Sequence, residues 1–143
     1  MEVRRLGVGD REAAEKACRL FGAVGDLDAA AFLGRPETAL IVVEDESGVA
    51  GWVYGHELVH PDGERTMLLY ALDVAERVRR HGHGKALVDA FVAHAREAGC
   101  TEVWVLTDDA NAAGIATYRA SGGRRDPVDH VMFTWKLAEG RHS

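Results

Sequence analysis

The sequence has few cysteines and prolines, and it has no long apolar segment. Only 2 cysteines and 3 prolines occur among 143 residues. Cys18 and Cys100 fall where helix or strand interiors are expected, so both are expected to be buried, reduced thiols rather than a disulfide. No apolar run approaches the roughly 20 residues of a membrane-spanning helix, and no apolar stretch typical of a signal peptide follows the first residues. The sequence therefore predicts a cytoplasmic protein without a membrane partner.

The chain also has no excess of positively charged residues. The formal net charge is −6, although charged residues make up 28% of the chain, which argues against nucleic acid as a partner. The length suits one domain, residues 1–143, and is too short for two ordinary ones. An acidic protein with a small basic patch suits an anionic cofactor together with a cationic substrate.

The hydrophobic pattern predicts an α+β sandwich, in which a mixed, mostly antiparallel sheet carries helices on both faces. Apolar and β-branched runs bounded by turn residues indicate strands, and amphipathic segments bounded by capping residues indicate helices. The expected strands are 3–8, 39–43, 49–58, 67–74, 102–107 and 130–137, and the expected helices are 10–23, 26–33, 86–98 and 110–120.

A cationic loop with two glycines joins the fourth expected strand to the third expected helix. Free N–H groups and the positive end of the helix dipole favour an anion there, and glycines allow the backbone to approach it closely. The loop therefore predicts a binding site for a diphosphate. Its residues are Arg79, Arg80, His81, Gly82, His83, Gly84 and Lys85.

The spacing of the glycines excludes two common phosphate motifs. A P-loop needs Ser or Thr after its lysine, whereas Ala86 follows Lys85. A dinucleotide fold needs G-x-G-x-x-G near the start of a βαβ unit, and only its first half is present. The pattern that fits is R-x-x-G-x-G. His81 and His83 do not indicate a metal site, because no third ligand lies nearby in the sequence.

Residues 72–84 resemble the strand-four to helix-three motif of the GNAT superfamily of acetyl-CoA-dependent N-acetyltransferases. Residues 111–122, which run from Asn111 through Tyr118 to Gly122, are similar to the N-x-x-A-x-x-x-Y-x-x-x-G helix of the same superfamily. The resemblance implies the GNAT fold with six to seven strands, acetyl-CoA as co-substrate and no metal. It leaves a homodimer open.

Segments 70–74 and 105–118 look like those of the GNAT-type aminoglycoside 3-N-acetyltransferases. Two departures are visible. Those enzymes carry an Asp directly after the strand-four Tyr, where this chain has Ala71, and the Asp of this chain comes two positions later. Most GNAT proteins have an aromatic residue where this chain has Gly123.

The resemblance also implies roles for the residues around the cofactor. Residues 79–85 would bind the pyrophosphate, and the backbone of Leu72, Asp73 and Val74 would bind the pantetheine arm as an added strand does. A backbone N–H near Leu72 would stabilise the oxyanion. Tyr118 is the candidate general acid at the cofactor sulfur. Asn111 either contacts the cofactor arm and caps its helix, or only caps it.

The general base stays open among Asp108, Asp73, Tyr70 and Glu57. Asp108 is preferred because it matches the aspartate position of the aminoglycoside group. Strand alternation predicts that Asp73 faces away from Tyr70 and Leu72. The acids proposed to bind a cationic acceptor are Glu57, Asp73, Asp108 and Asp109, with Asp126 and Asp129 nearby.

These observations predict an N-acetyltransferase that moves an acetyl group from acetyl-CoA to a primary amine of a small cationic molecule. An aminoglycoside is one such acceptor, and the reaction is expected to proceed by direct attack through a tetrahedral intermediate. One alternative is a protein or peptide N-acetyltransferase, and another is a non-catalytic acyl-CoA-binding module. The presence of Tyr118 and of the complete loop argues against the last.

Overall fold

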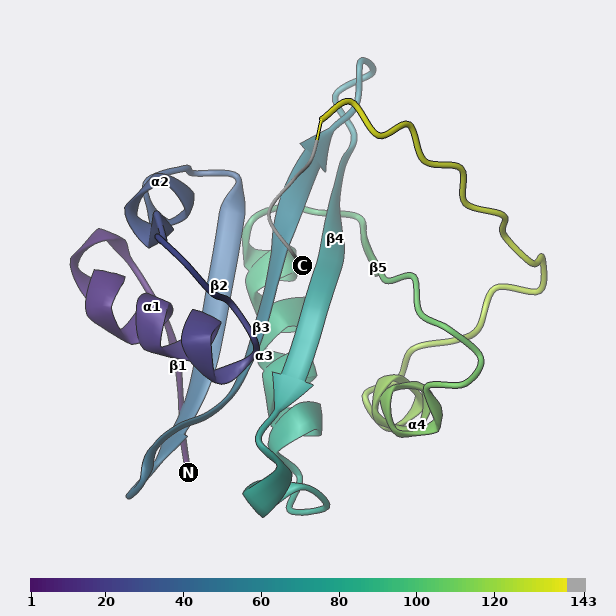
Figure 1. Cartoon of the computed structure of the whole chain (residues 1–143). Coiled ribbons are helices and arrows are strands. Elements are labelled where there is room, and N and C mark those ends of the chain that lie inside the picture. The colour runs from purple at the N-terminus through teal and green to yellow at the C-terminus, as the bar shows by residue number, and fades with distance from the viewer. Residues whose placement is uncertain (139–143) are drawn as a thin grey trace.

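A five-stranded sheet forms the centre of the computed structural model, which describes residues 1–138 (Figure 1). Residues 139–143 of the expected single domain lie outside the described part. Neighbouring strands are antiparallel from β1 to β4, and β5 runs parallel to β4. The mixed, mostly antiparallel sheet is therefore confirmed. Its strands, in spatial order, are β1 (Glu2–Arg5), β2 (Thr38–Asp45), β3 (Gly48–Val59), β4 (Arg65–Val74) and β5 (Glu102–Trp104).

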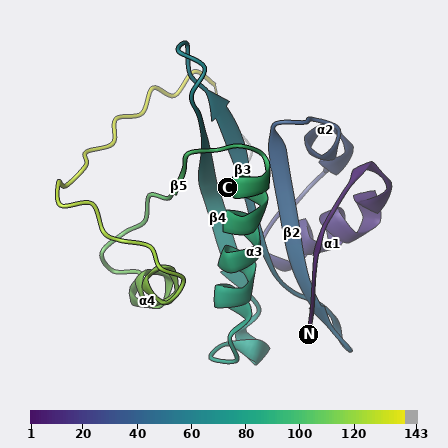
Figure 2. The same cartoon turned by 180° about the vertical axis from the view of Figure 1, so that it is seen from behind.

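Helices cover both faces of this sheet. A short 3-10 turn, η1 (Val8–Asp10), leads into α1 (Arg11–Leu20), which lies with α2 (Ala29–Leu33) on one face. The longest helix, α3 (His83–Glu97), packs on the other face after the 3-10 turn η2 (Glu76–Val78). The last helix, α4 (Ala112–Ala120), lies beyond β5, as the front and back views show (Figures 1 and 2).

The central strands are apolar on both sides because each side faces a helical layer. In β2, Ile41 and Val43 point into the core under α3, where Phe91 is completely buried. Leu40 and Val42 point into the second core, under α1 and α2. Burial on both faces explains why the β2 sequence is a continuous apolar run rather than an alternating one.

A β-bulge in β4 changes the direction of its side chains. Tyr54 pairs with Ala71 and Gly55 pairs with Leu69, so Tyr70 is an extra residue without a partner on β3. Such a bulge shifts the alternation of the strand by one position. Tyr70 and Asp73 consequently lie on the same face of the sheet, toward α1 and α2, and the expectation that they face opposite sides is wrong.

The sheet has five strands, not the six to seven that were expected. Residues 130–137 form no regular structure, although their pattern predicted a strand, because no neighbouring strand in the described chain supplies backbone partners. The fifth strand is also shorter than the expected 102–107. Its pairing with β4 stops at Leu68 and Trp104, just before the bulge, so the two strands part there.

Gly55 provides a test of the bulge. A Cβ at this position would meet the Leu68 carbonyl oxygen and would lie 2.7 Å from Cζ of Phe91. We expect Gly55→Ala to lower the free energy of unfolding by about 3 kcal/mol, because overpacking forces backbone and core to shift. Chemical denaturation followed by circular dichroism measures the change. Gly9→Ala is the matched control, since nothing lies within 4 Å of its added Cβ, and an equal loss in both variants would contradict the packing argument.

Candidate functional site

The N-terminus of α3 is open to an anion. The helix begins at His83, directly after Gly82, and no side chain caps it. Backbone N–H groups in the first turn of a helix have no acceptor within the helix, so those of residues 83–85 remain available. Arg80 and Gly82 adopt left-handed backbone conformations, with φ of 69° and 83°. These turns bring the chain around the positive end of a 15-residue helix, where an anion is favoured.

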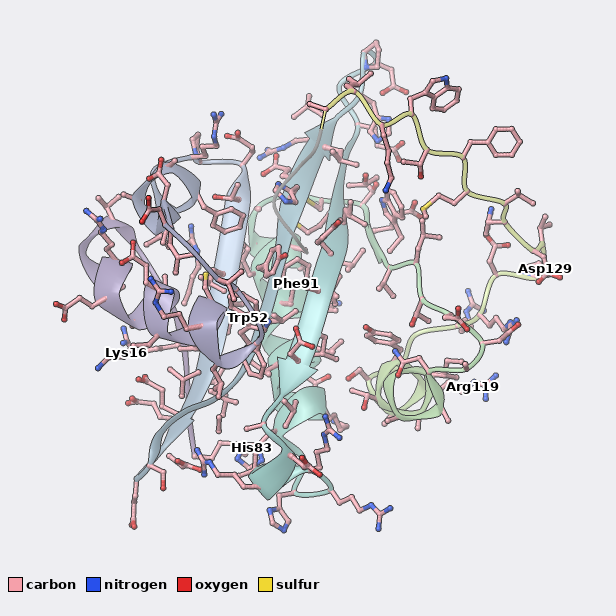
Figure 3. The ribbon with its side chains drawn as sticks, in the orientation of Figure 1. Lys16, Trp52, His83, Phe91, Arg119 and Asp129 are labelled. Carbon is pink, nitrogen blue, oxygen red and sulfur yellow. The ribbon has the colours of Figure 1, made fainter. Side chains whose placement is uncertain are left out.

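The side chains of the loop differ in what they can contribute. Among residues 1–138, Arg79 and Arg80 form no ion pair, so their charges are available to a ligand, whereas Lys85 pairs with Asp89 at 2.8 Å. His83 is only 8% exposed, and its buried Nδ1 has no hydrogen-bond partner. The His83 ring is therefore buried at the beginning of α3, as Figure 3 shows, with its centroid 6.4 Å from that of the His81 ring in the loop.

The parting of β4 and β5 leaves one backbone edge of β4 unpaired. Beyond Leu68, β4 has no strand neighbour on its β5 side in the described part of the chain. Leu72, Asp73 and Val74 occupy this stretch, immediately before the loop that leads to α3. An extended ligand arm can form hydrogen bonds to such an edge as an added strand does.

Helix α4 lies against the beginning of α3 and places Tyr118 at the core. A Cβ on Gly84 would lie 3.3 Å from Cγ2 of Thr117, so the missing side chain allows the two helices to approach closely. Tyr118 is half-buried and packs against the core under α3. Burial, and after it the Asp73 carboxylate, raises the pKa of Tyr118. Its phenol consequently stays protonated at neutral pH and can donate a proton.

Asn111 caps α4, as the sequence predicted. Its side-chain oxygen accepts a hydrogen bond from the Gly114 N–H at 3.1 Å, and its Nδ2 donates to Oγ1 of Thr107 at 2.9 Å. The cap fixes the start of α4 against the end of the β5 segment. A contact of Asn111 with a cofactor stays a prediction.

An aromatic cluster lies on the α1 side of β3 and β4. Tyr54 is 5.8 Å from Tyr70, and His56 is 6.2 Å from Tyr70, between ring centroids. Trp52 is 5.0 Å from Tyr54 and donates a hydrogen bond from Nε1 to Oδ2 of Asp73 at 2.8 Å. Tyr70 is 60% exposed, so this cluster is open to solvent next to a carboxylate. Burial, followed by the charges of Tyr70 and Asp73, raises the pKa of Tyr54.

Sequence reasoning missed Trp52, Tyr54 and His56. These residues alternate along β3, so the period of two could have indicated that they share a face. Their proximity to Tyr70 and Asp73, however, depends on the bulged pairing with β4, which no local pattern shows.

The four predicted acceptor-binding acids are not gathered in one place. Asp73 lies beside the aromatic cluster, whereas Glu57 lies on the α3 side of β3 and pairs with Arg65. Asp108 accepts a hydrogen bond from the Ala110 N–H at 2.7 Å in the turn before α4. Asp109 pairs with Arg125 at 2.7 Å. Only Asp73 therefore combines an aromatic surrounding with a position next to the open β4 edge.

Two further structural findings concern residues 1–138. None of the described helices is both long and apolar enough to cross a membrane. No group of three or more His, Cys, Asp or Glu side chains in this part of the chain could hold a metal ion.

Comparison with known proteins identifies sequence relatives of this chain. The sequence matches the acetyltransferase (GNAT) family over residues 4–122. It is 32% identical over 84 residues to a mycothiol acetyltransferase from Geodermatophilus obscurus, a match that covers 56% of this chain and 26% of that protein. The chain thus spans about a quarter of the length of this relative.

Solved structures agree in fold. An aminoglycoside acetyltransferase from an uncultured soil metagenomic sample, solved with trehalose and with sisomicin, gives TM-scores of 0.84 and 0.83 at 23% and 22% identity, covering 94% of this chain and 96% of that one. An aminoglycoside N-acetyltransferase in complex with CoA gives a TM-score of 0.76 at 16% identity, covering 96% of this chain and all 100% of that one. At these identities the similarity establishes the fold alone.

The position of Asp73 can be tested by titrating the tyrosines. Because its carboxylate raises the pKa of both Tyr54 and Tyr118, we expect Asp73→Asn to lower both values, since removing a negative charge favours the phenolate. Asparagine still offers an oxygen to Trp52. Ultraviolet absorbance of the three tyrosines against pH measures the shift. Asp89→Asn, on the exposed side of α3, should leave the titration unchanged, and identical curves for wild type and Asp73→Asn would contradict the proposed geometry.

Proposed function

The chain belongs to the acetyltransferase (GNAT) family, and from that premise we propose that it transfers an acetyl group from acetyl-CoA to a primary amine of a small cationic acceptor. GNAT acetyltransferases use acetyl-CoA. The observation that carries the proposal is the position of Asp73. This carboxylate lies beside the exposed aromatic cluster on the α1 face of the sheet and next to the unpaired edge of β4.

The donor side of the site is built from backbone groups. The open N–H groups of residues 83–85 and the charges of Arg79 and Arg80 suit a pyrophosphate. The left-handed conformations of Arg80 and Gly82 support this assignment, because they turn the chain at the beginning of α3. The unpaired edge of β4 suits the amides of a pantetheine arm, and the Leu72 N–H is the oxyanion donor in this proposal.

Tyr118 is the general acid in the proposal. Acetyl transfer from a thioester leaves a thiolate that must take up a proton. The raised pKa of Tyr118 keeps its phenol protonated at neutral pH. Two observations support this role: Tyr118 packs against the core under α3, and the Asp73 carboxylate on β4 contributes to its raised pKa.

Asp73 is the general base that the geometry favours over Asp108. An ammonium group must lose a proton before its nitrogen attacks the acetyl carbonyl. The Trp52 indole N–H holds one oxygen of the Asp73 carboxylate, and the other oxygen can accept that proton. Asp108 is likewise exposed and accepts one hydrogen bond, from the Ala110 N–H, but it lies in the turn before α4 and not on β4 beside the aromatic cluster.

The acceptor class follows from the aromatic cluster. Aromatic rings beside a carboxylate bind cationic amines through charge and through the ring faces, and sugar rings offer apolar faces for stacking. Solved neighbours of the same fold are aminoglycoside acetyltransferases. We therefore propose an aminoglycoside as the acceptor, with the 3-amino group as the acetylated position because segments 70–74 and 105–118 resemble the 3-N-acetylating enzymes.

Release of CoA thiol tests the proposed function. Acetyl-CoA is incubated with a panel of aminoglycosides, polyamines and peptides, and free thiol is followed by absorbance. We expect release with aminoglycosides, and nuclear magnetic resonance of the product identifies the acetylated amine. Release of CoA thiol only with peptides would show that the acceptor is a peptide and not an aminoglycoside. Tight CoA binding without release for any amine would overturn the enzymatic proposal for this chain.

The acid and the base can be separated by substitution. We expect Tyr118→Phe to lower kcat by about 10²–10⁴-fold, the usual contribution of a general acid, with a much smaller change in CoA affinity. Asp73→Asn should lower kcat by a similar factor and should remove the dependence of kcat/KM on a basic group. Asp108→Asn is the matched comparison. If Asp108→Asn abolishes turnover while Asp73→Asn does not, the roles of the two acids are reversed.

A substitution at Gly82 tests whether the loop before α3 binds acetyl-CoA. Its φ of 83° is strained for any side chain, so Gly82→Ala should raise the KM for acetyl-CoA by roughly 10-fold, because a strain of about 1–2 kcal/mol displaces the backbone amides. Gly99→Ala is the control, since Gly99 has a φ of 89° at the opposite end of α3. Gly99→Ala should lower stability without raising this KM. Equal KM values in both variants would exclude the loop as the donor site.

A further inference from the structure

The rings of the aromatic cluster hold one another in place. Tyr70 lies 5.8 Å from Tyr54 and 6.2 Å from His56, between ring centroids. Phe32 of α2 closes the circuit, because its ring lies 5.6 Å from Tyr54 and 5.6 Å from His56. Three of these four contacts are edge-to-face, a geometry that aromatic pairs favour. The four rings therefore form a surface whose shape is set before an acceptor binds.

Trp52 joins this surface to the Asp73 carboxylate. The two residues face each other across β3 and β4, and the indole N–H donates to Oδ2 at 2.8 Å. The Trp52 ring lies 5.3 Å from Phe21 and 5.0 Å from Tyr54, and it is only 9% exposed. Figure 3 shows Trp52 on the side of the sheet that carries α1. The buried indole thus fixes the carboxylate at one end of the row of rings.

Tyr70 is the exposed member of the cluster. It is 60% exposed, whereas Tyr54, His56 and Phe32 are partly buried. The bulge makes Tyr70 an extra residue without a partner on β3. An exposed ring that adjoins partly buried rings is an incomplete aromatic contact, and a flat apolar group of a ligand completes it.

The charge beside the rings suits a molecule with one ammonium group. Of the four acids predicted to bind a cationic acceptor, only Asp73 lies beside the cluster. Position 71, which pairs with Tyr54, is alanine and adds no charge. A molecule with several ammonium groups finds a partner for only one of them among these four acids, whereas a monoamine has its whole charge matched.

The spacing of the strand positions sets the length of the ligand. Side chains at alternate positions of a strand lie about 7 Å apart, and Trp52 and Tyr54 have this relation on β3. Asp73 stands opposite Trp52. One hydrogen bond and a linker of two carbon atoms span such a step, so an ammonium group at Asp73 brings an attached ring against Tyr54 and Tyr70. The cation then also lies close to the faces of the rings.

From these observations we infer that the acceptor site recognises, besides aminoglycosides, primary monoamines that carry an aromatic ring two carbon atoms from the nitrogen. Their acetylation rests on the proposed function. Asp73 takes a proton from the ammonium group, the nitrogen attacks the acetyl carbonyl carbon, and the carbon–sulfur bond breaks. The leaving thiolate takes a proton from Tyr118, so the products are the N-acetylated amine and CoA.

Binding tests the recognition of the ring apart from the chemistry. The indole N–H signals of the three tryptophans are followed by proton–nitrogen correlation spectroscopy with CoA present, and Trp52→Phe assigns one of them. We expect 2-phenylethylamine to shift the Trp52 signal with a Kd roughly 10-fold below that of n-butylamine, because the ring buries additional apolar surface. The signal of Trp104, on β5, is the internal control and should not move.

Turnover tests the contribution of Tyr70. The ratio of kcat/KM for 2-phenylethylamine to kcat/KM for n-butylamine should fall roughly 10-fold in Tyr70→Ala, because the exposed ring no longer covers that of the ligand. Val59→Ala, at a position of β3 that is 68% exposed, is the control and should leave the ratio unchanged. Circular dichroism checks folding, and Tyr70→Leu replaces Tyr70→Ala if the latter does not fold.

A second carboxylate tests the charge argument. Ala71→Asp should raise kcat/KM for spermidine relative to 2-phenylethylamine by roughly 10-fold, the usual effect of a hydrogen bond to a charged group. Ala71→Asn has nearly the same shape without the charge, and it should leave this preference unchanged. An equal change in both variants would contradict the match of one carboxylate to one ammonium group.

A tripeptide that begins with phenylalanine separates a peptide from a free amine. Its ring and amine have the same spacing, so a higher kcat/KM for the tripeptide than for 2-phenylethylamine would overturn the inference. Equal Kd values for 2-phenylethylamine and n-butylamine, or an unchanged ratio in Tyr70→Ala, would also overturn it, even if aminoglycosides are acetylated. Tighter binding of the aromatic amine without thiol release from any amine would overturn the proposed function and support the recognition of the ring.

Discussion

The close contact between Gly55 and the Leu68 carbonyl oxygen determines where β4 bulges, and the rest of the site depends on that bulge. Only a residue without a Cβ fits between this carbonyl group and Phe91. The extra residue, Tyr70, turns the following side chains by one position, so Asp73 faces the aromatic cluster. The pairing of β4 with β5 stops next to this bulge, which leaves the backbone edge near Leu72 without a strand partner in the described chain. One steric requirement in the core thus accompanies both the orientation of the carboxylate and the open edge beside it.

In the proposed function, the helix dipole and the strand edge act on neighbouring parts of one extended ligand. The N-terminus of α3 attracts negative charge at the end of the loop, whereas the edge of β4 offers uncharged hydrogen-bonding groups a few residues earlier. Gly84 lets α4 approach α3, which brings Tyr118 into the same region. Although the chain has a net charge of −6, Arg79 and Arg80 of this loop form no ion pair within residues 1–138.

The parts of the fold that the sequence predicted are those that depend on local patterns. The loop before α3, the helix that follows it and the Asn111 cap are each encoded within a few residues, and all three were predicted correctly. The face of Asp73 was predicted wrongly because the bulge at Tyr70 arises from pairing with β3. Residues 130–137 carry a strand pattern, but a strand forms only where another edge completes its hydrogen bonds. Which side of β3 carries Glu57 likewise depends on pairing, and the structure places it beside Arg65.

Neighbouring side chains of β4 point to opposite faces of the sheet, so core packing and the aromatic cluster constrain different residues of this short segment. Leu72 and Val74 pack toward α3, whereas Ala71 and Asp73 face the aromatic cluster. A substitution at position 71 changes one surface of the strand and leaves the packing on the other in place. In the proposed function, with Asp73 kept as the base, replacements at position 71 can alter the acceptor surface during evolution without passing through variants that have lost the core. One side of this short strand is thus constrained by packing, and the other by the proposed chemistry.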